Sequence, residues 1–171
     1  MDFTVDDTTT ELTGLVRDMG EQLVTDESLR ELDSRFGPGS ESGGTNRENA
    51  RFHARFWDEL VRAGVPAALA PERLGGAGLG VVGEALVMRE LGRVLAPVPL
   101  SPAIRASHLL AATGLDNRAA TVAEGREIAA VADGAAAEVD WAPVADLILH
   151  ASTDGLRVAE ASSVTVERTI P

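Results

Sequence analysis

The side chains of this sequence that could perform chemistry are few and scattered. The chain has three histidines, on separate predicted elements: His53, His108 and His150. None of them has a second histidine three or four positions further on, so a metal site is not indicated. Glu84 and Glu90 could act as general bases, and Ser101 and Ser107 as nucleophiles, but neither serine lies in a G-x-S-x-G motif. These residues alone predict neither a metal centre nor a hydrolase.

A glycine-rich stretch is the most distinctive grouping. Residues Gly78 to Gly83 match G-x-G-x-x-G, a pattern with which a strand-to-helix turn binds dinucleotides. That function requires a strand directly before the first glycine and an acidic residue about twenty positions later. Residues 71–77 separate the motif from the only possible strand, and the position twenty after Gly78 is Val98. The sequence therefore favours the alternative, a glycine-rich turn with close helix packing at Gly83.

Composition excludes several classes of function. The net charge of −12 argues against nucleic acid and against anionic membrane surfaces, because both bind clustered cations. The chain has no cysteine, which excludes disulfides and thiolate chemistry. It has no apolar run of membrane-spanning length and no signal-peptide pattern at its acidic start. We therefore expect a cytoplasmic protein without membrane insertion.

Helical periodicity predicts the elements that must position these residues. Capping boxes at Thr8–Glu11 and Thr45–Glu48 open two of the helices. Ser101 is predicted to be an N-cap, with Pro102 as the first helical residue. The expected helices cover residues 9–24, a weaker patch around 29–32, 46–63 with a glycine cap at Gly64, 81–94, a helix from 102 to a cap at Gly114, and 117–124. Residues 36–46, rich in glycine and serine, are expected to form a mobile loop.

Short β-branched or apolar segments follow the helices. They cover residues 127–132, 146–151, 156–160 and 164–168, and Asp154-Gly155 is a hairpin signal between the second and the third. The predicted fold class is therefore α+β, an N-terminal all-α helical bundle followed by a short, incomplete antiparallel β region. We expect the helical domain to cover residues 1–125 and the partial β domain residues 126–171.

Several motifs in one order resemble the N-terminal helical domain of acyl-CoA dehydrogenases. A helix with W-x-x-L and a glycine precedes a P-E-x-x-G-G-x-G turn, and a helix ending in E-L-G-R follows. The matching residues are Trp57, Leu60, Gly64, Pro71, Glu72, Gly75, Gly76, Gly78, Glu90, Leu91, Gly92 and Arg93. Residues 139–146 resemble the segment V-P-x-A-x-V-A-D that enters the family's β domain.

The resemblance implies an activity and a set of site residues. Members of the family use FAD to oxidise acyl-CoA thioesters to 2,3-enoyl-CoA; a carboxylate removes the α-proton while the β-carbon gives a hydride to the flavin. By resemblance, the residues lining the acyl chain would be Pro97, Val98, Leu100, Ser101 and Ile104. Trp141 would lie near the flavin.

The sequence also departs from the family. It does not contain the C-terminal helical domain that carries the catalytic glutamate, and residues 130–138 read AVADGAAAE where the flavin segment T-E-P-x-x-G-S-D is expected. We therefore expect no dehydrogenation by this chain alone, and homo- or hetero-oligomers with acyl-CoA dehydrogenase-type subunits. The alternatives are a non-catalytic helical interaction module or a small-molecule binder that uses the same pocket.

Overall fold

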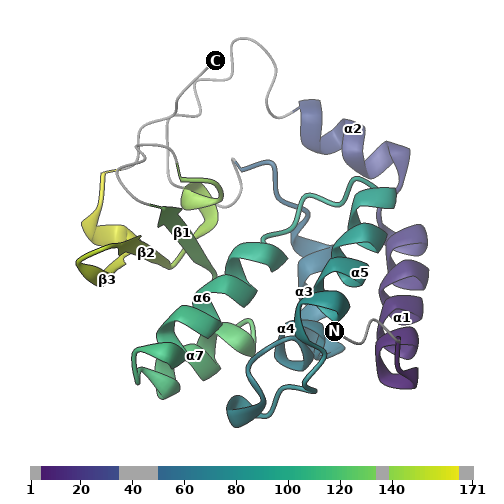
Figure 1. The fold of residues 1–171 in the computed structure, drawn as a ribbon. Helices are drawn as coiled ribbons and strands as arrows, with labels where there is room; N and C mark the ends of the chain where they lie inside the picture. Colours follow the sequence, from purple (N-terminus) through teal and green to yellow (C-terminus); the bar gives the residue numbers. More distant parts are fainter. Residues whose placement is uncertain (1–4, 35–49, 134–138, 166–171) are drawn as a thin grey trace.

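The computed structural model describes residues 5–34, 50–133 and 139–165, which form helices followed by a small sheet (Figure 1). The α-helices are α1 (Asp7–Leu23), α2 (Asp26–Ser34), α3 (Ala54–Arg62), α4 (Val65–Ala68), α5 (Gly80–Arg93), α6 (Leu100–Ala112) and α7 (Asp116–Ala123). Three-residue 3₁₀ turns are η2 (Glu72–Leu74), η3 (Ala142–Val144) and η4 (Ala161–Ser163). The strands are β1 (Ala129–Asp133), β2 (Leu147–Ser152) and β3 (Gly155–Glu160). This architecture confirms the α+β class.

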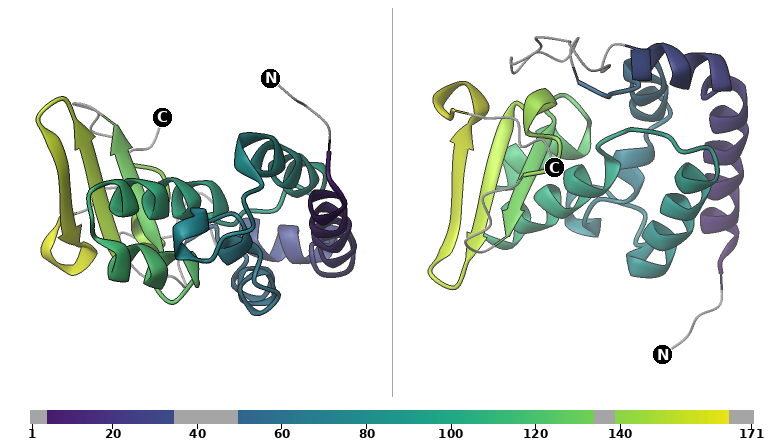
Figure 2. Two further views of the ribbon diagram at one scale, coloured as in Figure 1. Left: turned by 60° about the horizontal axis from the view of Figure 1, so that its bottom comes forward. Right: turned by 90° about the horizontal axis from the view of Figure 1, so that it is seen from above.

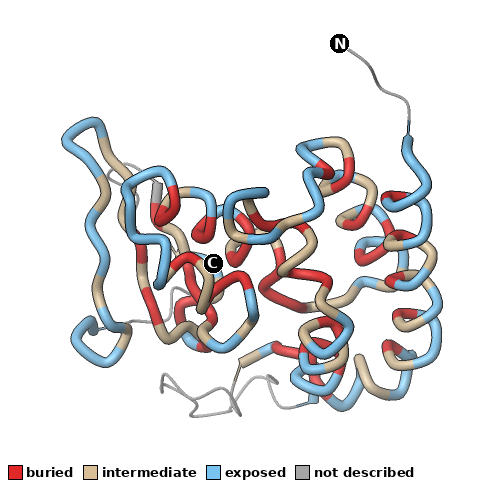
Figure 3. Tube along the Cα trace, turned by 90° about the horizontal axis from the view of Figure 1, so that it is seen from below, coloured by how far each residue is buried: buried red, intermediate tan, exposed pale blue. Residues whose placement is uncertain are grey.

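Helix α6 lies at the centre, between the other helices and the sheet. It packs against α7 and β1, while α1 packs along α5 and against α3 (Figure 2). The largest fully buried side chains come from both parts, among them Phe56, Leu60, Leu100, Leu110 and Leu147. Figure 3 shows the buried positions concentrated where the elements meet, while β3 lies exposed at the edge. One continuous apolar core therefore joins the helices to the sheet.

The sheet is mixed rather than antiparallel throughout, which corrects one part of the predicted fold. β2 and β3 form an antiparallel hairpin closed by the pair Ser152 and Gly155, as the Asp-Gly signal predicted. β1 and β2 instead run parallel, with Ala129 opposite Leu147. About a dozen residues separate the end of β1 at Asp133 from the start of β2 at Leu147, the length that the crossover of a parallel pair requires. The end of that crossover is fixed where Asp146 N–H donates to Ile128 O at 2.7 Å.

Two predicted helix starts are wrong by a few residues. The N-cap of α1 is Asp6, whose carboxylate accepts from Thr9 N–H at 2.6 Å, in place of Thr8. That hydrogen bond lowers the pKa of Asp6. Helix α6 begins at Leu100, so Ser101 lies in its first turn and is not the N-cap. Pro102 is tolerated there because the first turn of a helix leaves its N–H groups without helical partners.

The third predicted helix is shorter than its periodicity suggested. α3 begins only at Ala54, so Phe52 precedes the helix. Gly64 has the predicted left-handed conformation, with φ 75°. The chain then continues as α4, so no strand precedes the G-x-G-x-x-G motif within residues 50–80. Dinucleotide binding at this motif requires such a strand, so the structure argues against that function. The loop predicted at 36–46, the capping box at Thr45–Glu48 and most of the strand predicted at 164–168 lie outside the described residues.

In the described parts of the chain, none of the helices combines the length and apolar character needed to cross a membrane.

Candidate functional site

The turn between α5 and α6 carries the predicted acyl-chain residues. α5 is closed by two backbone hydrogen bonds, from Leu95 N–H to Gly92 O at 3.2 Å and from Ala96 N–H to Leu91 O at 3.0 Å. Leu95 takes the left-handed position of this C-cap with φ 53°, a place that usually holds glycine. The turn is therefore a closed, hydrogen-bonded structure that sets the start of α6.

The five predicted residues lie together, but they differ in exposure. Leu100 and Ile104 retain 0% and 3% of their accessible surface, and Val98 retains 7%. Pro97 and Ser101 are half-buried. In the chain as it stands, Pro97 and Ser101 present side-chain surface, whereas the other three pack mainly into the core behind them.

His53 anchors this turn to three other elements. Its backbone N–H donates to Pro97 O at 3.0 Å, and its ring Nδ1 accepts from Phe56 N–H at 3.2 Å, which caps α3. An accepting Nδ1 places the ring proton on Nε2. Nε2 lies 3.2 Å from Leu23 O and 3.3 Å from Ser28 Oγ, so it donates toward the corner between α1 and α2. Sequence reasoning missed this role, which removes His53 from the candidate ligands.

Replacing His53 by alanine is expected to lower the free energy of unfolding by about 1–2 kcal/mol, because α3 loses its cap and Leu23 O loses a buried donor. His53→Asn should lose less, since a side-chain oxygen can still accept from Phe56 N–H. Urea titration followed by circular dichroism compares the two variants. Equal stability of His53→Ala and wild type would contradict the anchoring role.

Trp141, the predicted flavin neighbour, reaches the same region through Phe52. The two rings meet edge to face, with centroids 6.5 Å apart and planes at 80°. Phe52 is buried and directly precedes His53, so the contact links the crossover before β2 to the turn at Pro97. Trp141 is itself half-buried, with φ 66°. A positive φ in a bulky residue is uncommon and costs free energy, which makes this position a candidate for a functional constraint.

The charged residues at the end of α5 form an ion cluster around the buried Glu90, where the sequence suggested a solvated edge. Glu90 is only 2% exposed. Its carboxylate accepts from Arg17 Nε at 2.9 Å and from Arg89 Nη2 at 2.8 Å, and Arg93 Nε lies 3.6 Å away. The hydrogen bond from Arg17 contributes most to lowering the pKa of Glu90 to about 2, against the opposing effect of burial. With its pKa this low and its oxygens bound by arginines, the carboxylate is a weak proton acceptor near neutral pH.

Two further candidate side chains have structural partners. Ser107 is buried and its hydroxyl donates to Ile104 O at 2.8 Å within α6, so it is not an activated nucleophile. His108 Nε2 lies 3.3 Å from Leu69 O, which ties α6 to the residue after α4. Among the described residues, no group of three potential metal ligands lies close enough together to hold an ion.

Comparison with known proteins decides the family. The model of the acyl-CoA dehydrogenase N-terminal domain matches residues 42–135, more than half of the chain. The chain belongs to this family. The matched range contains the glycine-rich turn, α5 and all five predicted acyl-chain residues, whereas Trp141 lies beyond it.

Curated and solved relatives agree with this assignment. Acyl-CoA dehydrogenase FadE27 of Mycobacterium tuberculosis is 36% identical over 115 residues, which cover 67% of this chain and 27% of that protein. The ChsE4-ChsE5 complex of Mycobacterium tuberculosis has a chain that is 29% identical, with a TM-score of 0.73 over 94% of this chain and 49% of that one. A variant of the Tcur3481-Tcur3483 steroid ACAD is 27% identical, with a TM-score of 0.69 over 91% of this chain and 48% of the other.

These coverages show how much of each relative the chain matches. It spans about half the length of the solved relatives and roughly a quarter of the length of the curated one. The acyl-CoA dehydrogenase-like N-terminal region is therefore present.

Proposed function

We propose that this chain supplies the helical domain that lines the acyl-chain pocket of an FAD-dependent acyl-CoA dehydrogenase. A longer polypeptide or a second subunit supplies the catalytic carboxylate. The observation that carries the proposal is the match of the family's N-terminal domain to residues 42–135. Within that range, the turn from Pro97 into α6 would face the acyl chain of an acyl-CoA thioester. The similarity to chains of the ChsE4-ChsE5 complex and of the Tcur3481-Tcur3483 steroid ACAD supports assembly with a further acyl-CoA dehydrogenase-type subunit.

The local geometry supports a flavin neighbour at Trp141. Its half-buried ring is held by the edge contact with Phe52, and Phe52 is continuous with the residue that anchors the Pro97 turn. An apolar aromatic surface beside an acyl site fits the face of an isoalloxazine ring. When bound, FAD would accept the hydride from the substrate. The residues of this chain would position the acyl chain and exclude water.

Flavin retention tests this proposal. The purified chain is mixed with FAD, desalted, and its visible spectrum recorded. Retained flavin with shifted bands is expected, and Trp141→Ala should reduce the retained fraction. Leu15→Ala on α1, which removes an exposed apolar side chain on a different element, serves as the control and should leave retention unchanged. Turnover of an acyl-CoA by the chain alone with an electron acceptor would contradict the proposal that the catalytic carboxylate comes from elsewhere.

One alternative function is favoured by a specific observation. The chain covers 49% and 48% of the solved relatives, which also fits a helical module that keeps the fold and binds a partner subunit without flavin. A folded chain that retains no FAD and forms a stable complex with an acyl-CoA dehydrogenase-type subunit would favour this alternative.

A further inference from the structure

Helix α5 has a second apolar stripe on the face opposite its core contacts. The stripe consists of Val81, Ala85, Met88, Gly92 and Leu95. These residues are spaced alternately four and three positions apart, which places them on one side of an α-helix. The alternation is that of a coiled-coil seam. The core face of α5, by contrast, is formed by Gly83, Val87 and Leu91.

This stripe is exposed except at Met88, which also packs against the core. Val81 is 79% exposed and Leu95 74%, the two highest values among the large exposed apolar side chains. Ala85 and Gly92 are also exposed, and Met88 is half-buried. In Figure 1, α5 lies in front of α3 with α1 beside it, and the described elements leave its outer face uncovered. The α5 stripe is therefore an unpartnered helix face.

Leu95 makes this exposure costly. It holds the left-handed C-cap position of α5, where glycine would avoid the steric cost of a side chain. The leucine nevertheless extends the stripe by one more apolar residue past the end of the helix. A strained and exposed apolar residue is best accounted for by a contact that covers it.

Charged residues flank the stripe in a self-complementary way. Glu84 lies on one side and Arg89 on the other, five residues apart. In two parallel helices packed along such a seam, the residue at the position of Glu84 on one helix lies beside the residue five positions later on the other helix. Glu84 of one copy would then face Arg89 of a second copy, and the reverse pair would form by symmetry.

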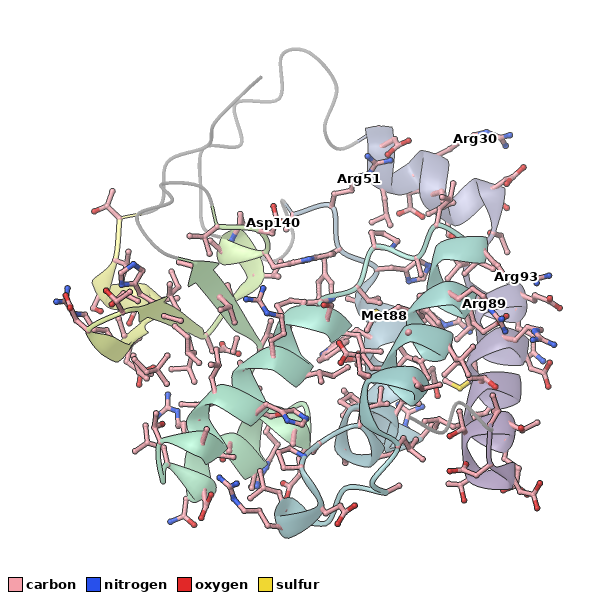
Figure 4. All side chains as sticks on the ribbon, in the orientation of Figure 1. Arg30, Arg51, Met88, Arg89, Arg93 and Asp140 are labelled. Carbon is pink, nitrogen blue, oxygen red and sulfur yellow. The ribbon has the colours of Figure 1, made fainter. Side chains whose placement is uncertain are left out.

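Arg89 can take part because its pairing inside the chain leaves donors available. Its side chain is 58% exposed although Nε and Nη2 both bind Glu90 Oε1. Figure 4 shows Arg89 and Arg93 extending from α5 toward α1, and Met88 labelled on α5 beside them. An antiparallel arrangement would bring the Glu84 flank of one helix against the same flank of the other, so Glu84 would not meet Arg89.

We propose that the α5 stripe binds the α5 stripe of a second copy of this chain, with the two helices parallel and Glu84 paired with Arg89 across the two-fold axis. The small residues Ala85 and Gly92 let the backbones approach, while Val81, Met88 and Leu95 fill the seam. This inference extends the assembly in the proposed function and does not depend on flavin.

Sedimentation equilibrium of the purified chain over a concentration series tests the proposal. Wild type is expected to dimerise, and Ala85→Glu should weaken the dimer by at least about a hundredfold because it buries a charge in the seam. Ala85→Glu keeps a good helix former at an exposed position, and circular dichroism confirms that the variant folds. The matched control is Val158→Glu on the exposed edge strand β3, where the side chain is 39% exposed; it should leave the dimer intact.

Two further variants distinguish a specific seam from a merely apolar surface. Glu84→Arg should weaken the dimer by about tenfold or more through the Arg–Arg contact, and this loss should shrink as salt is added. Leu95→Gly should weaken the dimer while raising the midpoint of thermal unfolding, because it relieves the C-cap. A monomer at all concentrations, or a dimer that Val158→Glu breaks and Ala85→Glu does not, overturns the proposal. A monomer that still retains FAD would leave the proposed function in place.

Discussion

Gly76→Ala is expected to lower the free energy of unfolding by about 3 kcal/mol. A Cβ at Gly76 would lie 1.8 Å from Ala70 O and 2.6 Å from Ala70 C. Both are backbone atoms, so no side-chain rotation can relieve the overlap. The chain would have to open the glycine-rich turn, and the start of α5 would move with it.

The turn cannot open cheaply because hydrogen bonds hold both of its sides. Gly76 N–H donates to Pro71 O at 3.2 Å, and Ala77 N–H donates to Ala68 O at 2.9 Å. Gly75, just before, has φ 88° and ends the 3₁₀ turn η2. Separation of Gly76 from Ala70 would therefore break contacts to α4 as well as to η2.

Urea unfolding followed by circular dichroism measures the loss. Gly14→Ala is the matched control, because nothing lies within 4 Å of a Cβ at Gly14 in the interior of α1. That variant should gain about 0.5–1 kcal/mol from the higher helix propensity of alanine. The two glycine-to-alanine changes should thus have opposite signs, and a Gly76→Ala variant as stable as wild type would show that the close approach to Ala70 is absent in solution.

The helices could be predicted because their signals are local. Apolar periodicity located α1, α5, α6 and α7 to within a few residues, and Gly64 and Gly114 were correctly placed in left-handed conformations. Caps were predicted less well, since several neighbouring polar residues could serve. Asp6 competes with Thr8 at the start of α1, and the imidazole of His53 caps α3 without belonging to the usual set of capping residues.

The burial of Glu90 could not be predicted because it depends on distant residues. Arg17 precedes Glu90 by 73 positions, and only the packing of α1 along α5 brings them together. Locally, Arg89, Glu90 and Arg93 form an ordinary charged helix end. The parallel pairing of β1 with β2 was missed for a similar reason, because the crossover has no strong turn signal and its direction depends on how residues 139–146 return to Ile128.

The acyl-chain residues are predicted through a resemblance, and the structure adds which of them keep accessible surface. Pro97 and Ser101 keep accessible surface, whereas Leu100 and Ile104 are buried. The hydrogen bond from His53 to Pro97 joins this turn to the start of α3, and the contact between Phe52 and Trp141 brings the segment before β2 to the same region. Neither contact could be predicted from a local sequence pattern, because each joins segments more than forty positions apart.

Glu90→Gln is expected to destabilise the chain by about 2 kcal/mol at neutral pH. The amide cannot balance the charges of Arg17, Arg89 and Arg93, although these side chains are 43%, 58% and 61% exposed and solvent screens part of the loss. Glu59→Gln is the matched control, because it breaks a surface ion pair with Arg62 and should change stability by less than about 1 kcal/mol.

The dependence on pH identifies the charge as the cause. The pKa of Glu90 is lowered from 4.5 to about 2 in the folded chain, so the unfolded chain binds the proton more readily. The contribution of Glu90 to stability is then complete above pH 4.5 and is lost as the pH falls toward 2. Wild type and Glu90→Gln should therefore differ most above pH 5 and converge near pH 2 in urea titrations. A difference that stays constant across this range would assign the loss to packing of the side chain instead of its charge.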